Sequence, residues 1–127
     1  MPRTTVLSDT APTPGGPYSH AARSAEGGPL FLAGQVGADP ATGQLVDGGA
    51  GPQTRQALAN LEQVLAAAGR TLADVVKVNI YVASMADFAA VNEAYAAVFE
   101  QPYPARTTVA VAGLPLDARV EVECVAG

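Results

Sequence analysis

The run Val75–Val82, with the sequence VVKVNIYV, lies between two segments of helical periodicity. β-Branched side chains favour strands, and the even-numbered residues of this run are all apolar, which predicts a strand with one buried face. Apolar residues at helical spacing predict one helix over residues 52–69 and a second over residues 86–99. Because each helix has one apolar stripe, each must pack on a partner, and a sheet containing the central strand provides that partner.

Strands are also predicted near both ends of the chain. A Gly-Gly pair between Ser19–Ser24 and Leu30–Gly34 predicts a β-hairpin, and a short strand is expected at Thr4–Leu7. The last two predicted strands are Ala105–Val111 and Arg119–Val125. This order of elements predicts a single α+β domain over residues 1–127, a mixed β-sheet with two helices packed on one face. What covers the other face of the sheet then becomes the functional question.

The last two strands are expected to pair with each other as a hairpin. A register with Val109 opposite Val120 gathers the branched side chains on one face, whereas a shift by one residue would mix charges into that face. The preferred register places Arg106 and Thr108 on the opposite face together with Glu121. Two interpretations of that face stay open: a solvated surface with an ion pair worth about 0–1 kcal/mol, or the floor of a ligand cleft.

The charge of the chain disfavours several classes of partner. It has 12 acidic and seven basic residues, a net charge of −5, and no run of Lys or Arg. Binding a phosphate backbone requires a basic stripe that releases counterions, so nucleic acid and anionic membranes are not expected partners. Only 15% of the residues are charged and 49% are hydrophobic, which indicates that partner subunits cover part of the surface.

The numbers of cysteines and histidines, and the N-terminal segment, bear on the expected disulfides, metal sites and cellular location. Cys124 and His20 are the only residues of their types, so no disulfide within the chain and no multi-cysteine or multi-histidine metal site is expected. The N-terminal MPRTTVLSDT lacks an apolar stretch, and no segment approaches about 18 apolar residues. We therefore expect a cytoplasmic location, Cys124 as a buried thiol, and a hydrogen-bonded structural role for His20.

Ordered sequence blocks along nearly the whole chain resemble one known family. They are GPYSHA at residues 16–21, LAGQVGADPATGQLV at 32–46, QTRQALANLEQVLAAAG at 53–69, DVVKVNIYV at 74–82, DFAAVNEAY at 87–95, PARTTVAVAGLP at 104–115 and VEVECVA at 120–126. Over these blocks the chain is similar to the reactive intermediate deaminases, the Rid or YjgF-type family. The resemblance implies a homotrimer of chorismate-mutase-like subunits, with active clefts at the subunit interfaces and with neither a metal nor an organic cofactor.

A reaction is also implied by the resemblance. Family members hydrolyse reactive 2-imino acids, or the related enamines, that pyridoxal-phosphate enzymes release from amino acids. The products are 2-keto acids and ammonia. The expected function is therefore that of a cofactor-independent imine or enamine deaminase, and the expected partners are small 2-imino and 2-keto acids.

The expected site residues follow from the resemblance, position by position. Arg106 in PARTT matches the arginine that binds the substrate carboxylate, and Glu121 in RVEVE matches the carboxylate associated with the reacting water. Tyr18 in GPYS matches a tyrosine that lines the cleft, Gly34 in AGQ a backbone contact, and Asn92 in VNEAY a further pocket residue. Arg106, Glu121 and Tyr18 are the expected catalytic residues. An arginine can bind a carboxylate in bidentate fashion, and a glutamate can move protons between water and amine.

Two positions depart from the family pattern. Ala33 stands where the usual SGQ has a serine, and Thr108 stands where a cysteine is usual after PARS. Both keep the cleft small, and Thr108 is an expected substrate-binding residue. Three other functions stay open. They are a small-carboxylate-binding or regulatory module without turnover, a deaminase for another enamine such as an aminoacrylate, and an RNA-cleaving activity, which the acidic charge disfavours.

Overall fold

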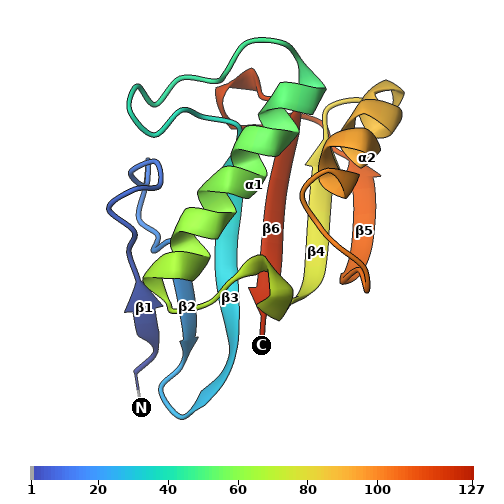
Figure 1. Cartoon of the computed structure of the whole chain (residues 1–127). Helices are drawn as coiled ribbons and strands as arrows, with labels where there is room; N and C mark the ends of the chain where they lie inside the picture. Colours follow the sequence, from blue (N-terminus) through green and yellow to red (C-terminus); the bar gives the residue numbers. More distant parts are fainter. Residues whose placement is uncertain (1) are drawn as a thin grey trace.

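Six strands form one mixed sheet in the computed structural model, which describes residues 2–127 (Figure 1). In the order β1-β2-β3-β6-β4-β5, neighbouring strands are antiparallel except β4 and β5, which are parallel. Helices α1 and α2 both lie on one face of this sheet. The predicted α+β class, mixed sheet and one-sided helices are confirmed. The elements are β1 Thr4–Val6, β2 Ala21–Ser24, β3 Gly27–Val36, α1 Ala50–Ala67, η1 Leu72–Asp74, β4 Val75–Val82, η2 Met85–Asp87, α2 Phe88–Ala96, β5 Ala105–Ala110, η3 Pro115–Asp117 and β6 Val120–Ala126.

The core lies between the helices and the sheet. Helix α1 buries Leu58, Leu61 and Leu65, and the strands beneath it contribute fully buried side chains such as Ile80 and Val122. Burying an aliphatic side chain of this size contributes about 1.5–3 kcal/mol. This layer therefore fixes which side chains of each strand face the helices. The alternate side chains point to the other face of the sheet, which no helix covers and which we call the open face.

Helix α1 ends where its glycine predicts. Gly69 has a φ of 72° and its N–H donates to the Ala66 carbonyl, while the Arg70 N–H donates to the Leu65 carbonyl at 2.8 Å. This pair of bonds is the Schellman motif, and its left-handed residue favours glycine. The helix stops there, and the chain turns toward β4.

The predicted hairpin of the last two strands is wrong. β6 lies between β3 and β4, and β5 pairs with β4 at the edge of the sheet. Helix α2 connects β4 to β5, and a strand that follows such a crossover returns parallel to the strand before it. The next segment then crosses to the far side of β4. There β6 buries Val120, Val122 and Cys124 against the helices.

Because β5 pairs with β4 and not with β6, Arg106 and Glu121 do not share a face of the sheet. Arg106 pairs with Val78 of β4, whose side chain is buried beneath the helices, and Thr108 follows on the same face. Glu121 pairs with Tyr81, which belongs to the alternate set of β4 side chains. Because side chains alternate along a strand, Arg106 and Glu121 lie on opposite faces of the sheet, and their predicted common face is wrong.

At the beginning of β4 the side chains do not follow the simple alternation between buried and exposed positions. The register against β6 shifts between Val75 and Lys77, so an extra residue is accommodated there. As a result Val75 is buried and Val76 is exposed, whereas the pattern predicts Val76 on the buried face. From Val78 onward the prediction is confirmed.

Candidate functional site

Arg106 lies near the start of edge strand β5, where three side chains of α2 surround its guanidinium group. Its Nη2 donates to Asn92 Oδ1 at 2.6 Å. Its Cζ lies 4.8 Å from the centroid of the Tyr95 ring and 5.8 Å from that of Phe88. Both distances are within the range at which a cation is attracted to the face of an aromatic ring. Helix α2 thus holds the guanidinium at the sheet edge.

A hollow of about 290 Å³ opens beside this guanidinium. Within residues 2–127 Arg106 forms no ion pair with an acidic side chain. Arginine stays charged at any ordinary pH, so a small anion that enters the hollow meets an unneutralised cation among mostly apolar walls. The hollow is lined by Asn92, Tyr95, Ala96, Tyr103, Pro104 and Arg106.

Two hydroxyl groups are buried on the helix side of the sheet. Thr108 Oγ1 and the Tyr95 hydroxyl have no hydrogen-bond partner within the described residues. Burial raises the pKa of Tyr95 to about 12; nearby Cys124 adds to the rise and the positive charge of Arg106 opposes it. The phenol therefore stays neutral at physiological pH, and the positive charge of Arg106 is left for a ligand.

Tyr18, Gly34 and Glu121 line a second, larger hollow of about 820 Å³. Gly34 lies where the register of β3 against β6 shifts between Leu32 and Gln35. Bulges of this kind redirect the strand and often occur beside functional sites. Here the irregular segment brings the Gly34 backbone against the Glu121 side chain.

The Glu121 carboxyl group is partly buried in this hollow. Burial raises its pKa above the ordinary value, and the negative charge of Glu123 adds to the rise. Such a carboxyl group holds a proton more readily than an exposed one, which suits a group that accepts and returns protons. Tyr18 faces the same hollow from the loop before β2, and its hydroxyl oxygen accepts a hydrogen bond from the Gly15 N–H at 3.2 Å.

His20 fixes the loop that carries Tyr18. Its ring is almost fully buried, and its Nδ1 accepts a hydrogen bond from the Ser8 N–H at 2.9 Å. With Nδ1 as acceptor, Nε2 carries the proton and donates to the Pro12 carbonyl at 2.7 Å. Both ring nitrogens are thereby used by the backbone, and the predicted structural role of His20 agrees with these bonds.

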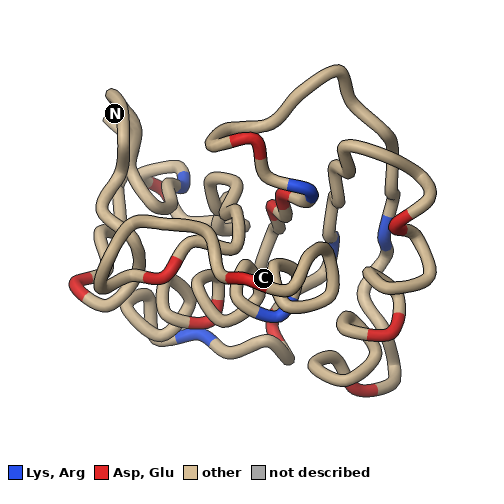
Figure 2. Tube along the Cα trace, turned by 90° about the horizontal axis from the view of Figure 1, so that it is seen from above, with Lys and Arg blue, Asp and Glu red and all other residues tan. Residues whose placement is uncertain are grey.

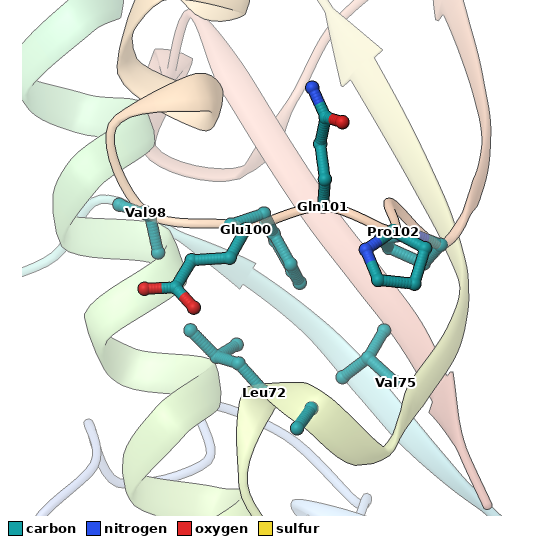
Figure 3. A pocket seen from close by; sticks show the side chains of 9 residues that line it. Leu72, Val75, Val98, Glu100, Gln101 and Pro102 are labelled. Atoms are coloured by element: carbon teal, nitrogen blue, oxygen red, sulfur yellow. The ribbon is translucent and has the colours of Figure 1, made fainter.

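A third pocket, of about 260 Å³, lies between η1 and the connector that leads from α2 to β5 (Figure 3). Leu72, Val75 and Phe99 give it apolar walls, and Glu100 is its only charged lining residue. In Figure 3 the Glu100 carboxylate points across the pocket while the Gln101 amide points away. A single exposed carboxylate supplies neither an anion clamp nor an acid–base pair, so we do not assign the reaction to this pocket.

The charged side chains of the described residues are scattered. Figure 2 shows the lysines and arginines spread singly over the chain, without a continuous basic track. Among residues 2–127 no group of three or more His, Cys, Asp or Glu side chains is arranged to hold a metal ion. In the same part of the chain no helix combines the length and the apolarity needed to cross a membrane.

The structure divides the six sequence-predicted site residues into two groups. Arg106, Asn92 and Thr108 lie on the helix side at the β5 edge, and Arg106 and Asn92 are in direct contact. The other three line the hollow of about 820 Å³. One chain does not bring the two groups together. The second group is Tyr18, Gly34 and Glu121.

The two rings that contact Arg106 are not among the site residues predicted from the sequence. Phe88 and Tyr95 belong to the apolar stripe of the second predicted helix, and such a stripe is normally interpreted as core. A signal was present, because Phe88, Asn92 and Tyr95 follow one another at intervals of four and three residues. This spacing places them on one side of a helix, so a pocket residue between two aromatic residues predicts aromatic walls for the pocket.

The chain is similar to known proteins over nearly its whole length. The family model described as Endoribonuclease L-PSP matches residues 8–127. A RutC family protein of Pyrococcus horikoshii is 46% identical over 121 residues, which cover 95% of this chain and 94% of that protein. A Mus musculus protein named 2-iminobutanoate/2-iminopropanoate deaminase is 45% identical and covers 95% of this chain and 89% of its own. The crystal structure of RidA from the Antarctic bacterium Psychrobacter sp. PAMC 21119 has a TM-score of 0.91 at 39% identity, covering 97% of this chain and 98% of that one.

The fold, with its one-sided helices over a mixed six-stranded sheet, defines an α+β protein of the YjgF type. The chain belongs to the family described as Endoribonuclease L-PSP, the YjgF/Rid family. The resemblance seen in the sequence blocks is confirmed. The family is described as an endoribonuclease, whereas several relatives are named 2-iminobutanoate/2-iminopropanoate deaminase.

Proposed function

We propose that this protein hydrolyses reactive 2-imino acids, and the enamines in equilibrium with them, to 2-keto acids and ammonia. The observation that carries the proposal is a firmly held guanidinium that has no acidic partner within residues 2–127, combined with a partly buried carboxyl group of raised pKa. The first suits the carboxylate of an imino acid, and the second suits proton transfer. Relatives named 2-iminobutanoate/2-iminopropanoate deaminase, at 40–45% identity, support the same reaction.

The proposal includes an assembly, because Arg106 and Glu121 lie on opposite faces of one sheet. A substrate that contacts both must lie between two chains, with Arg106 from one and Glu121 from the other. The open face also carries exposed apolar side chains: Phe31 is 57% exposed and Val109 44% exposed. Exposed apolar surface of this kind favours contact between subunits. We therefore propose a homotrimer with a cleft at each subunit interface.

Within such a cleft the reaction needs only positioning and proton transfer. Arg106 binds the carboxylate of the imino acid through parallel N–H···O bonds and so orients its C=N carbon. Glu121 takes a proton from water as the water oxygen bonds to that carbon, and the imine nitrogen, protonated from solvent, becomes an amine. Glu121 then returns its proton to the amine, the C–N bond breaks, and the carbinol O–H loses its proton to solvent as the C=O forms. Ammonia and a 2-keto acid leave, with no change of oxidation state.

The remaining predicted residues have supporting roles in this proposal. Tyr18 closes the wall of the cleft around the reacting carbon, and Gly34 lets the backbone approach both Glu121 and the substrate. Asn92 accepts a hydrogen bond from Arg106 and so holds its guanidinium in place. Thr108, on the same face of β5, is a small side chain that leaves room for the substrate. No step requires a metal or an organic cofactor. The substrates arise where pyridoxal-phosphate enzymes act, so we place the activity in the cytoplasm as removal of damaging intermediates.

The proposal is tested with imino acids generated in situ by an amino-acid oxidase. We expect the wild-type protein to accelerate the release of ammonia and keto acid. Glu121→Gln keeps the shape and hydrogen-bonding capacity but cannot take a proton, so it should lose most of the acceleration while still binding pyruvate. Glu62→Gln removes an equal charge from an exposed position on α1, outside the lining of the hollow, and is the matched control that should remain active. Equal activity of Glu121→Gln and wild type would contradict the proton-transfer role.

Binding without turnover is the alternative that the same site allows. Arg106 would hold a small carboxylate whether or not a reaction follows. If the wild-type protein binds pyruvate but leaves imine hydrolysis at the uncatalysed rate, the module is a carboxylate binder. RNA cleavage is disfavoured by the net charge of −5 and by the scattered basic residues.

A further inference from the structure

The side chains around Arg106 all come from one side of helix α2. Phe88, Asn92 and Tyr95 occupy successive turns on one side of α2, and all three contact the Arg106 guanidinium. Asn92 accepts one N–H bond, whereas the two rings meet the cation through their π electrons. Within residues 2–127 the bond to Asn92 is the only hydrogen bond of the guanidinium. A guanidinium has five N–H donors, all in its plane, so further donors are left for a ligand.

We infer that Phe88 and Tyr95 are positioning residues, which fix the plane of the Arg106 guanidinium so that a carboxylate is bound edge-on. The inference rests on the proposed function only in taking the ligand to be a carboxylate. Asn92 restrains rotation by holding Nη2 at 2.6 Å, and the rings restrain tilt at 4.8 Å and 5.8 Å. A bidentate pair requires the two planes to coincide, so a tilted guanidinium binds a carboxylate less well.

Simple packing does not explain Phe88. A core residue of α2 such as Val91 is 0% exposed, whereas Phe88 is 36% exposed and lies over a charged group. Tyr95 is different, because it is buried and stacks on Phe99 with ring centroids 4.5 Å apart. Substitution of Tyr95 therefore perturbs the core as well, and Phe88 is the residue on which the inference is tested.

The first measurement compares pyruvate affinity and imine hydrolysis for Phe88→Leu, Phe88→Tyr and wild type. Removing the ring should raise both the Kd for pyruvate and the KM by about two- to fivefold, the factor expected for a partly exposed cation–π contact. Phe88→Tyr keeps a ring and should restore both values. Met85→Leu, at an exposed apolar position in the preceding turn, is the matched control and should match wild type. Thermal midpoints of Phe88→Leu and Met85→Leu should agree.

A double-mutant cycle separates positioning from direct contact. If Phe88 acts through Arg106, adding Phe88→Leu to Arg106→Ala should cause no further loss of pyruvate affinity. If the ring contacts the ligand directly, the two- to fivefold loss will persist in the Arg106→Ala background, and this result would overturn the inference. Pyruvate titrations followed by NMR reach the millimolar range that the weakened variants require.

A readout without turnover completes the test. The Nε–H signal of Arg106 should show a ring-current shift that moves in Phe88→Leu and returns in Phe88→Tyr. If that shift and the pyruvate affinity respond but the wild type does not hydrolyse imino acids, the positioning role stands and the proposed reaction fails. If hydrolysis is observed but neither quantity changes in Phe88→Leu, the reaction stands and the positioning role is refuted.

Discussion

A Cβ atom at residue 34 would lie 2.7 Å from Oε2 of Glu121 and 2.9 Å from its Cδ. Glycine is therefore needed where the backbone of β3 passes the carboxyl group. The crowded atoms belong to the end of a flexible side chain, so a larger residue would displace the carboxyl group and leave the strand in place. Gly34 thus sets the position of Glu121 in the hollow that both residues line.

Gly34→Ala is expected to lower imine hydrolysis by about 10²-fold, because displacement of a catalytic group by about 1 Å can cost that much. The fold should remain, with the far-ultraviolet circular dichroism of wild type. The matched control is Gly113→Ala, since no heavy atom lies within 4 Å of the Cβ added there. Initial rates of keto-acid release give the comparison. Wild-type rates in Gly34→Ala would show that the exact place of the carboxyl group is unimportant.

Arg106→Ala is expected to weaken pyruvate or 2-oxobutanoate binding by about ten- to a hundredfold, the usual effect of removing a charged hydrogen-bond partner. Arg106→Lys should also be impaired, since lysine keeps the charge but loses the planar fork. Arg55→Ala, at an exposed position on α1, provides the control. Calorimetric titration and hydrolysis rates measure the effect. Near-wild-type hydrolysis in Arg106→Ala would refute the carboxylate clamp.

Local elements could be predicted from the sequence because their causes are local. The glycine at 69 and the periodicity before it predict α1 and its end, and the β-branched run predicts β4. Strand order is different, because the partner of a strand depends on distant residues and on the path of the connections. Alternation says which residues of β5 share a face, but it does not say that β4, and not β6, lies beside it.

The face of Arg106 could not be predicted for a second reason. Hydrophobic alternation assumes that the more apolar face of a strand turns inward. In β5 the reverse holds: Val109 is on the open face, and Arg106 and Thr108 point toward the helices. An apolar open face is what the proposed surface between subunits requires, and a rule applied to a single chain takes no account of such a surface.

Light scattering coupled to size exclusion should therefore report about three times the chain mass of 12.8 kDa. Val109→Glu places a charge on the open apolar face and should lower the mass toward one chain, because a buried unpaired charge is costly. Imine hydrolysis should fall with it, since each proposed cleft needs two chains. Met85→Glu adds the same charge on the helix side and should leave the mass unchanged. A wild-type monomer at micromolar concentration would contradict the shared cleft.

Glu121→Gln should be more stable than wild type at neutral pH. Burial, with the added effect of Glu123, raises the folded-state pKa of Glu121 above the ordinary 4.5, so the folded state binds this proton more tightly than the unfolded state. Stability is therefore lost as the pH rises through the window between the two pKa values. Below about pH 4.5 the carboxyl group is protonated in both states and the loss is absent. Glutamine does not ionise and avoids the loss at every pH.

Thermal unfolding of wild type and Glu121→Gln between pH 4 and pH 8 measures this effect. The difference in Tm should be small at pH 4 and should widen, in favour of Glu121→Gln, as the pH rises. Glu62→Gln removes an equal charge from an exposed position on α1 and should show no such widening. Under the proposed reaction this gain should accompany a loss of hydrolysis, as is common where a catalytic group is kept in an unfavourable environment. A wild type more stable than Glu121→Gln at pH 8 would mean that the carboxylate is stabilised in the folded state, and the raised pKa would be wrong.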